Sequence, residues 1–476
     1  MDRDWRTQML PDISPSSFRD PAGYVFVDGG VVKRAVTVHG EPDYRRFMSS
    51  GLYQRLVGES LLVAHEERDV AIRRSPDVAT VLVPEQIPTI SYPYEWCFGQ
   101  LRDAALLTLR LEAHALEHGM TLKDASAFNV QFRGSQPIFI DTLSFEPNDG
   151  GPWPAYNQFC RHFVAPLALM SYVGSIFSRC WKPSLDGFPL DGASALLPRR
   201  TYLRFGLLVH IHLHARSQRR YSRCAPPGLE TPRPRAPGAD RKRALVESLR
   251  ATVEGLRVSG NATEWSDYYE HTSHYGGESE ARKKEIVGRM IDRVRPALVY
   301  DLGGNTGEYG RLATGRGAAC VCFDIDPQCV QSNYERSKAA GDQHMLPLVM
   351  DLTNPTPPLG FHLRERLSLL ERDRADLLLA LAIIHHLRIT GNVPFLRIAA
   401  FLADLGEQMV VEYVPKNDVM AQSLLRSRKD TFFDYEEDHF LRAFQEHFVM
   451  EESVPIPGSG RTIYLFRRRI DASGRR

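Results

Sequence analysis

The sequence has few cysteines, and they are scattered. Only seven of the 476 residues are cysteine, an odd number, and no pair has the spacing of a zinc site. Two of them, Cys320 and Cys322, fall inside an apolar run that has the composition of a buried strand. A reduced, cytoplasmic compartment is therefore the simpler interpretation.

The chain also lacks an excess of charge of one sign and a long apolar run. With 59 basic and 58 acidic residues its formal charge is +1, so no global field points to nucleic acid or to an anionic membrane. The most apolar run, 163–177, is too short to cross a bilayer and contains Ser171 and Tyr172, so it predicts a core helix and no membrane span. Residues 1–6 are charged, and we expect no signal peptide.

What the sequence does contain is an apolar run, 298–302, that carries Asp301 and then breaks into glycines. The glycines are Gly303, Gly304 and Gly307. This pattern predicts a buried strand, a tight turn that lets backbone N–H groups approach a ligand, and a helix that resumes near Glu308. The spacing differs from the dinucleotide fingerprint, and a carboxylate at Asp301 would repel a pyrophosphate and attract an ammonium. A ligand with an amino-acid end and a nucleoside end, such as S-adenosylmethionine, fits better.

Further apolar runs follow, and each leads to a polar side chain. The run 320–323 ends at Asp324, at the spacing of one strand-helix-strand unit from Asp301, where an acid can accept both ribose hydroxyls. The next run, 345–350, ends at Asp351, which is suitably placed for an adenine amino group. Two later runs lead to His385 and His386 and to Glu412.

This ordered series resembles the class I S-adenosylmethionine-dependent methyltransferases over roughly the C-terminal two-fifths of the chain. The resemblance implies a Rossmann-like sheet with helices on both faces. It also implies a set of cofactor-binding residues, namely Asp301, Gly303, Gly304, Gly307, Asp324 and Asp351. Candidates for acid-base help to the acceptor are Glu412, the better motivated, and His385 and His386, for which a structural role is slightly favoured.

A second polar pattern lies in the N-terminal part of the chain. A β-hairpin is expected at 24–36, helical sequence at 43–67, a strand at 81–84 and a helix at 101–118. Asp124, Asn129 and Asp141 then follow in an order that resembles the catalytic loop and metal-binding strand end of protein-kinase-like phosphotransferases. The resemblance implies that Asp124 would orient a hydroxyl while Asn129 and Asp141 would hold Mg²⁺. No convincing glycine-rich phosphate loop precedes this pattern, and polar turn residues of a simple hairpin are the alternative.

Together these patterns predict an α/β protein with an α+β domain at 1–215, a Pro/Arg-rich linker or loop at 216–240 and the methyltransferase domain at 241–476. Whether the first domain is kinase-like or presents the substrate stays open. The full length resembles a two-part bacterial methyltransferase family that includes a NoeA-like nodulation protein of rhizobia. The resemblance implies S-adenosylmethionine as cofactor and a small-molecule or glycan acceptor, while the balanced charge predicts no nucleic-acid substrate. A non-catalytic binding protein on a methyltransferase scaffold and a bifunctional protein with a phosphotransferase half are the alternatives.

Overall fold

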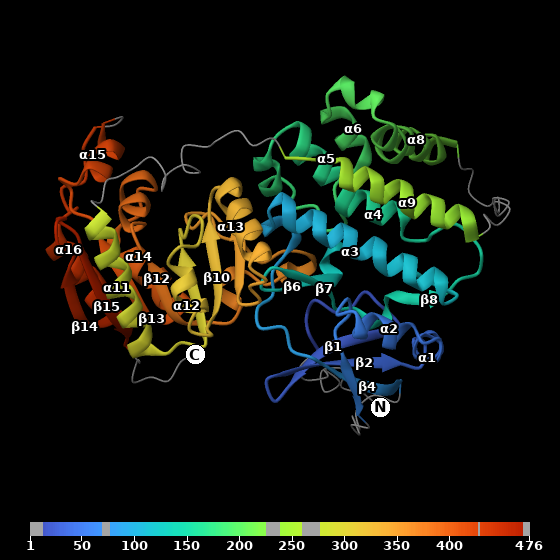
Figure 1. Ribbon diagram of the computed structural model, residues 1–476, viewed down its shortest axis with the longest axis horizontal. Coiled ribbons are helices and arrows are strands. Elements are labelled where there is room, and N and C mark those ends of the chain that lie inside the picture. The colour runs from blue at the N-terminus through green and yellow to red at the C-terminus, as the bar shows by residue number, and fades with distance from the viewer. Residues whose placement is uncertain (1–12, 69–76, 225–238, 259–276, 427–428, 470–476) are drawn as a thin grey trace, which may run out of the picture.

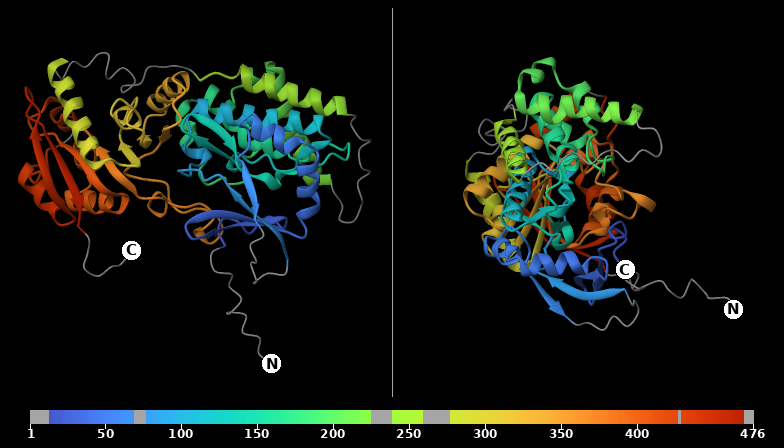
Figure 2. Two further views of the ribbon diagram at one scale, coloured as in Figure 1. Left: turned by 60° about the horizontal axis from the view of Figure 1, so that its bottom comes forward. Right: turned by 90° about the vertical axis from the view of Figure 1, so that its right-hand side faces the viewer.

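The chain forms two halves that lie side by side. The computed structural model describes residues 13–68, 77–224, 239–258, 277–426 and 429–469. Figure 1 shows the N-terminal half in blue to green and the C-terminal half in yellow to red. The same division is visible from two other directions (Figure 2).

The N-terminal half begins with a four-stranded antiparallel sheet in the order β1-β2-β4-β3. Its strands are β1 (Gly23–Asp28), β2 (Val31–Thr37), β3 (His65–Arg68) and β4 (Val78–Pro84). The predicted hairpin is confirmed, because β1 and β2 pair around Gly29 and Gly30, whose φ values of 61° and 78° suit a tight turn.

Helices α1 (Glu41–Ser49) and α2 (Leu52–Gly58) connect β2 to β3. The prediction of helical sequence up to Glu67 is wrong beyond Gly58, because His65–Arg68 is strand β3 and pairs with β4. The polar sequence of β3 has no strand periodicity, so its conformation depends on the neighbouring strand rather than on local preference.

A helical layer completes this half. The predicted helix at 101–118 is confirmed as α3 (Phe98–Glu117), and Gly119 follows it with a φ of 71°. Two short two-stranded antiparallel sheets follow, made by β5 (Met120–Leu122) with β8 (Phe145–Pro147) and by β6 (Val130–Arg133) with β7 (Gln136–Phe139). Among the described residues, the further α-helices of this half are α4 (Tyr156–Phe159), α5 (Ala165–Tyr172), α6 (Leu190–Leu196), α7 (Phe205–Leu207), α8 (His214–Cys224) and α9 (Ala239–Gly255).

The expected linker and domain boundary fall among these helices. Residues 216–224 of the expected linker belong to α8, and 225–238 lie outside the described residues. Helix α9 begins close to the expected boundary at residue 241, but it packs along α3 of the N-terminal half (Figure 1) and also contacts α7. The boundary itself stays a prediction.

The C-terminal half is a seven-stranded mixed sheet in the order β11-β10-β9-β12-β13-β15-β14. Strands β9 to β13 are parallel, and β15 runs antiparallel to both of its neighbours, β13 and β14. The strands are β9 (Leu298–Leu302), β10 (Ala319–Asp324), β11 (Met345–Val349), β12 (Ala375–Ala380), β13 (Gly406–Tyr413), β14 (Phe448–Pro455) and β15 (Thr462–Arg468).

Helices cover both faces of this sheet, so a mixed α/β fold is confirmed. One face packs against α11 (Gly277–Val294) and α12 (Gly310–Thr314) through a cluster that includes Met290, Val299 and Cys322. The other face packs against α13 (Pro327–Ala339), α14 (Phe395–Leu405) and α16 (Glu437–Gln445). Because successive strand residues point to opposite faces, the nearly unbroken apolar runs of the sequence are what a doubly covered sheet requires.

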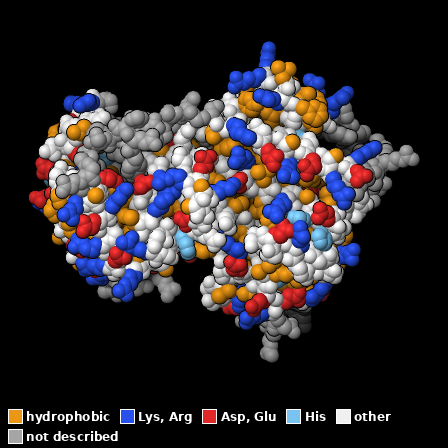
Figure 3. All heavy atoms as spheres, in the orientation of Figure 1, with side chains coloured by type: hydrophobic (Ala, Val, Ile, Leu, Met, Phe, Trp, Pro, Cys, Tyr) orange, Lys and Arg blue, Asp and Glu red, His pale blue; other side chains and the backbone are white. Residues whose placement is uncertain are grey.

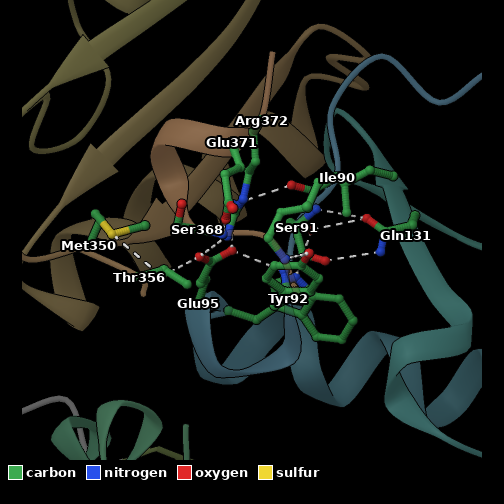
Figure 4. A network of polar contacts seen from close by, with 12 residues as sticks. Ile90, Ser91, Tyr92, Glu95, Gln131, Met350, Thr356, Ser368, Glu371 and Arg372 are labelled. Carbon is green, nitrogen blue, oxygen red and sulfur yellow. Dashed lines mark hydrogen bonds and ion pairs between the residues drawn. The ribbon is translucent and has the colours of Figure 1, made fainter. Parts of the chain in front are cut away.

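The two halves share one apolar core and several polar contacts. Tyr334 of α13 packs on Phe132 and donates a hydrogen bond of 2.7 Å to Asp103 of α3. Figure 4 shows a second junction, where the Glu95 carboxylate accepts hydrogen bonds from the Arg372 guanidinium and the Thr356 hydroxyl, both in the segment after β11. None of the described helices is long and apolar enough to cross a membrane.

Candidate functional site

The order of the strands places a natural ligand site at one edge of the C-terminal sheet. From β9 the chain proceeds outward to β10 and β11, and then returns to the other side of β9 at β12. At such a reversal of strand order, here between β9 and β12, open α/β sheets bind ligands outside the carboxyl ends of the strands. Asp301, Asp324, His385 and Glu412 all lie at or just beyond the carboxyl ends of these parallel strands.

The glycine loop after β9 bends across the end of β10. The N–H groups of Gly303 and Gly304 donate to the Phe323 carbonyl at 2.8 and 3.0 Å. Gly303 and Gly307 have φ values of 71° and 81°, which favour glycine. A Cβ on Gly304 would lie 2.5 Å from both the Asp301 carboxylate and the Cys322 sulfur, so any side chain there would displace the loop.

Asp301 points inward from this loop. It is 1% exposed, and its Oδ2 accepts the Gly310 N–H at 2.9 Å, at the start of α12. Burial raises the pKa of the Asp301 carboxyl to about 7, and the nearby Asp324 carboxyl adds to that shift. Asp301 therefore fixes the path of the glycine loop, and its burial does not favour the direct ammonium contact that the sequence suggested.

Asp324 lies at the carboxyl end of β10 and supports the same loop. One carboxylate oxygen accepts the Asn305 N–H and the other accepts the Asp326 N–H, both at 2.8 Å. Burial raises the pKa of the Asp324 carboxyl to about 6. Each carboxylate oxygen has a second acceptor site, so the group is held in place and retains capacity for two ligand hydroxyls.

Asp351 connects this edge of the sheet to the N-terminal half. Its Oδ1 accepts the N–H and hydroxyl of Thr353, at 2.9 and 2.6 Å, and its Oδ2 forms a 2.9 Å ion pair with Arg179. Arg179 ends the 3-10 helix η6 (Ser175–Arg179) of the other half. The sequence did not reveal Arg179, because the two residues are 172 positions apart.

Glu412 lies between two cations that the sequence analysis also missed. Its carboxylate is 0% exposed, with Lys283 Nζ at 2.7 Å and Arg461 Nη1 at 3.1 Å. Arg461 also pairs with Asp418, and Lys283 lies over the Tyr309 ring at 4.6 Å. The periodicity of α11 indicates that Lys283 faces inward, but only the folded sheet shows its partner.

The histidine pair follows a strained bend after β12. Ala382 has a φ of 51°, a conformation that costs energy for a residue with a side chain, and the π-helix η11 (His386–Thr390) begins directly after His385. Among the described residues, neither ring nitrogen of His385 has a hydrogen-bond partner. Burial lowers the pKa of His385 well below its ordinary value, and His386 and Arg461 add to this, so His385 is neutral near pH 7.

The three polar residues of the N-terminal pattern converge in space. The Asp124 carboxyl interacts with the Asn129 side chain and lies near the Asp141 carboxyl, and burial raises its pKa. Asp141 also forms a 2.8 Å ion pair with Arg34 of β2, a residue that the sequence analysis did not select. Within the described ranges no group of three or more His, Cys, Asp and Glu side chains is arranged for a metal ion.

A surface hollow lies at the opposite edge of the C-terminal sheet. It is lined by Ile291, Asp292, Arg295, Pro296 and residues 316–318, which precede β9 and β10. The polar residues discussed above follow the strands instead, so the hollow and the candidate site are separate.

Comparison with known proteins gives one relative along almost the whole chain. The sequence is 34% identical over 457 residues to nodulation protein NoeA of Rhizobium meliloti strain 1021, which covers 95% of both chains. No family model matches the sequence.

Two solved methyltransferase structures resemble part of the chain. N-methyltransferase NodS from Bradyrhizobium japonicum WM9 is 10% identical to this chain, with a TM-score of 0.32. The match covers 41% of this chain and 98% of the other. Magnesium protoporphyrin IX methyltransferase from Synechocystis PCC 6803 is 15% identical, with a TM-score of 0.31 and coverages of 44% and 100%.

Proposed function

The chain belongs to the family of nodulation protein NoeA, and from this membership and the geometry of the sheet edge we propose that it is an S-adenosylmethionine-dependent methyltransferase. The observation that carries the proposal is the reversal of strand order between β9 and β12, beside which the glycine loop is held against Asp324 by a backbone hydrogen bond from Asn305. The acceptor is a small molecule or a carbohydrate-type compound with a role in nodulation or host specificity.

The residues present suit the cofactor. Asp324 would accept the ribose hydroxyls, since its carboxylate is fixed and keeps two acceptor sites. Asp351 would accept the adenine amino group beside Arg179, and Asp301 with Gly303, Gly304 and Gly307 would shape the loop for the amino-acid end. When bound, the cofactor supplies a methyl group on a sulfonium, which is an activated leaving group, so the protein mainly aligns the acceptor and excludes water.

Proton removal from the acceptor falls better to His385 than to Glu412. Glu412 is neutralised by Lys283 and Arg461, so accepting a proton would break a buried ion-pair network. His385 is neutral and can accept a proton directly, but its lowered pKa makes it a weak base, so it suits an acceptor that becomes more acidic as the methyl group is transferred. We therefore assign Glu412 to positioning Lys283 and Arg461, and His385, with His386 beside it, to the acid-base role.

Binding of S-adenosylhomocysteine, measured by calorimetry, tests the cofactor site. We expect Asp324→Ala to weaken binding at least tenfold, because lost hydrogen bonds to a carboxylate cost about 1.5–3 kcal/mol. Asp376→Ala is the matched control, since Asp376 also accepts two backbone N–H groups, from Ala297 and Leu298, but lies at the opposite edge of the sheet. No binding by the wild type would favour a non-catalytic scaffold instead.

The acceptor can be traced with labelled S-adenosylmethionine. Extracts from cells that lack the gene would receive the label together with wild-type protein or His385→Asn. We expect label in a small-molecule or glycan fraction with the wild type and at least tenfold less with the variant. Label in RNA or DNA would contradict the proposed acceptor class.

A second candidate function is nucleotide binding by the N-terminal half. It is favoured by the convergence of Asp124, Asn129 and Asp141, which would act as hydroxyl-orienting and Mg²⁺-holding groups. Arg34, already paired with Asp141, would contact the phosphates. Calorimetry with ATP tests this idea: Mg²⁺-dependent binding that Asp141→Asn abolishes supports it, and no binding with or without Mg²⁺ removes it.

A further inference from the structure

The helical layer of the N-terminal half carries an exposed apolar surface flanked by arginines. We call it the helical cap. Its exposed apolar residues are Leu196, Tyr202, Leu203, Phe205 and Leu213, and its arginines are Arg199, Arg200, Arg204, Arg216, Arg219 and Arg220. Figure 3 shows apolar and basic side chains together at the top of the molecule, over α6 and α8.

The tip of the helical cap is held in a fixed conformation. Leu203 and Phe205 are 88% and 74% exposed, at the junction of the 3-10 helix η7 (Arg199–Leu203) and α7. Beside them, Tyr202 stacks on His212 at 3.7 Å, and the His212 Nε2 is 2.9 Å from the Thr201 hydroxyl. The structure thus buries Thr201 and turns its large apolar neighbours outward.

The charge of the helical cap differs from that of the whole chain. No aspartate or glutamate occurs between Asp191 and Glu230, although the chain as a whole has a net charge of only +1. Asp191 lies at the first turn of α6, away from Leu196 at its last residue. On the neighbouring α9, Glu247 and Glu254 both lie within ion-pair distance of Arg250, which offsets one of their two charges.

We propose that the helical cap docks on the surface of an anionic phospholipid membrane. Leu203 and Phe205 enter the boundary between headgroups and acyl chains, and the surrounding arginines contact lipid phosphates. Exposed apolar side chains with basic ones beside them are what interfacial membrane binding requires, and each basic residue near such a surface raises binding about fivefold. Because the described helices include no membrane-spanning one, this attachment is peripheral.

Co-sedimentation with vesicles tests the docking. We expect the full chain to bind vesicles of phosphatidylcholine with about one-third phosphatidylglycerol, to bind pure phosphatidylcholine at least tenfold more weakly, and to lose binding as salt is raised. The double substitution Leu203→Ser/Phe205→Ser should reduce binding at least tenfold. Arg199→Gln/Arg200→Gln/Arg204→Gln should reduce it about a hundredfold on the anionic vesicles.

The matched control is Phe361→Ser/Leu363→Ser, which removes another largely exposed apolar pair, 71% and 63%, from the C-terminal half. We expect vesicle binding unchanged in this control, and circular dichroism should show that all variants are folded. No vesicle binding by the wild type, or equal loss in the control, would overturn the proposal. So would a concentration-dependent dimer in sedimentation velocity that Leu203→Ser/Phe205→Ser dissolves, since the occupant would then be a second copy of the chain.

Discussion

Glu412 is enclosed by two cations, and this decides what its removal would do. Glu412→Gln leaves Lys283 and Arg461 buried with less compensating charge, so we expect the free energy of unfolding to fall by about 3–5 kcal/mol. Urea unfolding measures this change. Glu407→Gln on the same strand is the control, because Glu407 is about half exposed and its ion pairs with Arg374 and Arg468 should contribute at most about 1 kcal/mol. Equal losses in the two variants would contradict the assignment.

Asp301 makes stability depend on pH in a defined direction. Burial raises its pKa from 3.8 to about 7, so between about pH 4 and pH 7 the folded state keeps a proton that the unfolded state releases. Raising the pH through this window therefore lowers the free energy of unfolding. Asp301→Asn keeps an acceptor for the Gly310 N–H but does not titrate. We therefore expect the free energy of unfolding of this variant to rise by about 2–4 kcal/mol relative to that of the wild type as the pH is raised through this window. Urea unfolding at several pH values checks this, and a difference that is constant with pH would disagree.

Sequence reasoning found the carboxylates of the site but not the cations that accompany them. Asp301, Asp324 and Asp351 could be selected because each follows an apolar run at the expected spacing. Lys283, Arg461 and Arg179 could not, because each meets its partner only after the sheet and the two halves have assembled. The periodicity of α11 turns Lys283 inward, but nothing in the local sequence identifies the partner of any of the three cations.

At the scale of elements, the strongest sequence signals were those with a local physical cause. The β1–β2 hairpin and the stop of α3 at Gly119 were predictable because glycine at positive φ determines both. Strand β3 was not, because its pairing with β4 is a tertiary interaction. The apolar runs of the sequence also do not reveal the order of the strands in the C-terminal sheet, which reverses at β9.

The glycine loop should tolerate no side chain at Gly304. Its φ is ordinary, but a Cβ would lie 2.5 Å from the Asp301 carboxylate and the Cys322 sulfur, so Gly304→Ala should shift the loop. We expect a loss of about 1–3 kcal/mol in stability and at least tenfold in S-adenosylhomocysteine affinity. Thermal unfolding and calorimetry measure both. The control is Gly255→Ala in α9, where a Cβ meets nothing within 4 Å, and it should leave stability and affinity unchanged. If Gly304→Ala also changed neither, the loop would be less tightly packed than the structure indicates.

At the scale of the whole molecule, the sequence predicted two parts but not their contact. The two halves meet at the Glu95 carboxylate (Figure 4). It accepts hydrogen bonds from the Arg372 guanidinium at 2.6 and 3.0 Å and from the Thr356 hydroxyl at 2.6 Å. It also accepts the Tyr92 N–H of its own half at 3.0 Å. Glu95 is 277 residues from Arg372, and nothing in the local sequence of either marks the pair. A fully buried pair of this kind constrains how the two halves fit together.

Breaking this pair should uncouple the two halves. Glu95→Gln leaves the Arg372 guanidinium buried without a carboxylate, which costs about 3–5 kcal/mol. This cost weakens the contact between the two halves and leaves the packing within each half unchanged. We expect one calorimetric unfolding transition for the wild type and two for Glu95→Gln. S-adenosylhomocysteine should raise the midpoint temperature of only the transition that belongs to the C-terminal half. The control is Lys338→Gln, since the Lys338–Asp103 pair also joins the halves, but Lys338 is half exposed and Asp103 keeps its hydrogen bond from Tyr334, so the pair should contribute at most about 1 kcal/mol. If Glu95→Gln kept a single transition at the wild-type temperature, this junction would not be what couples the halves.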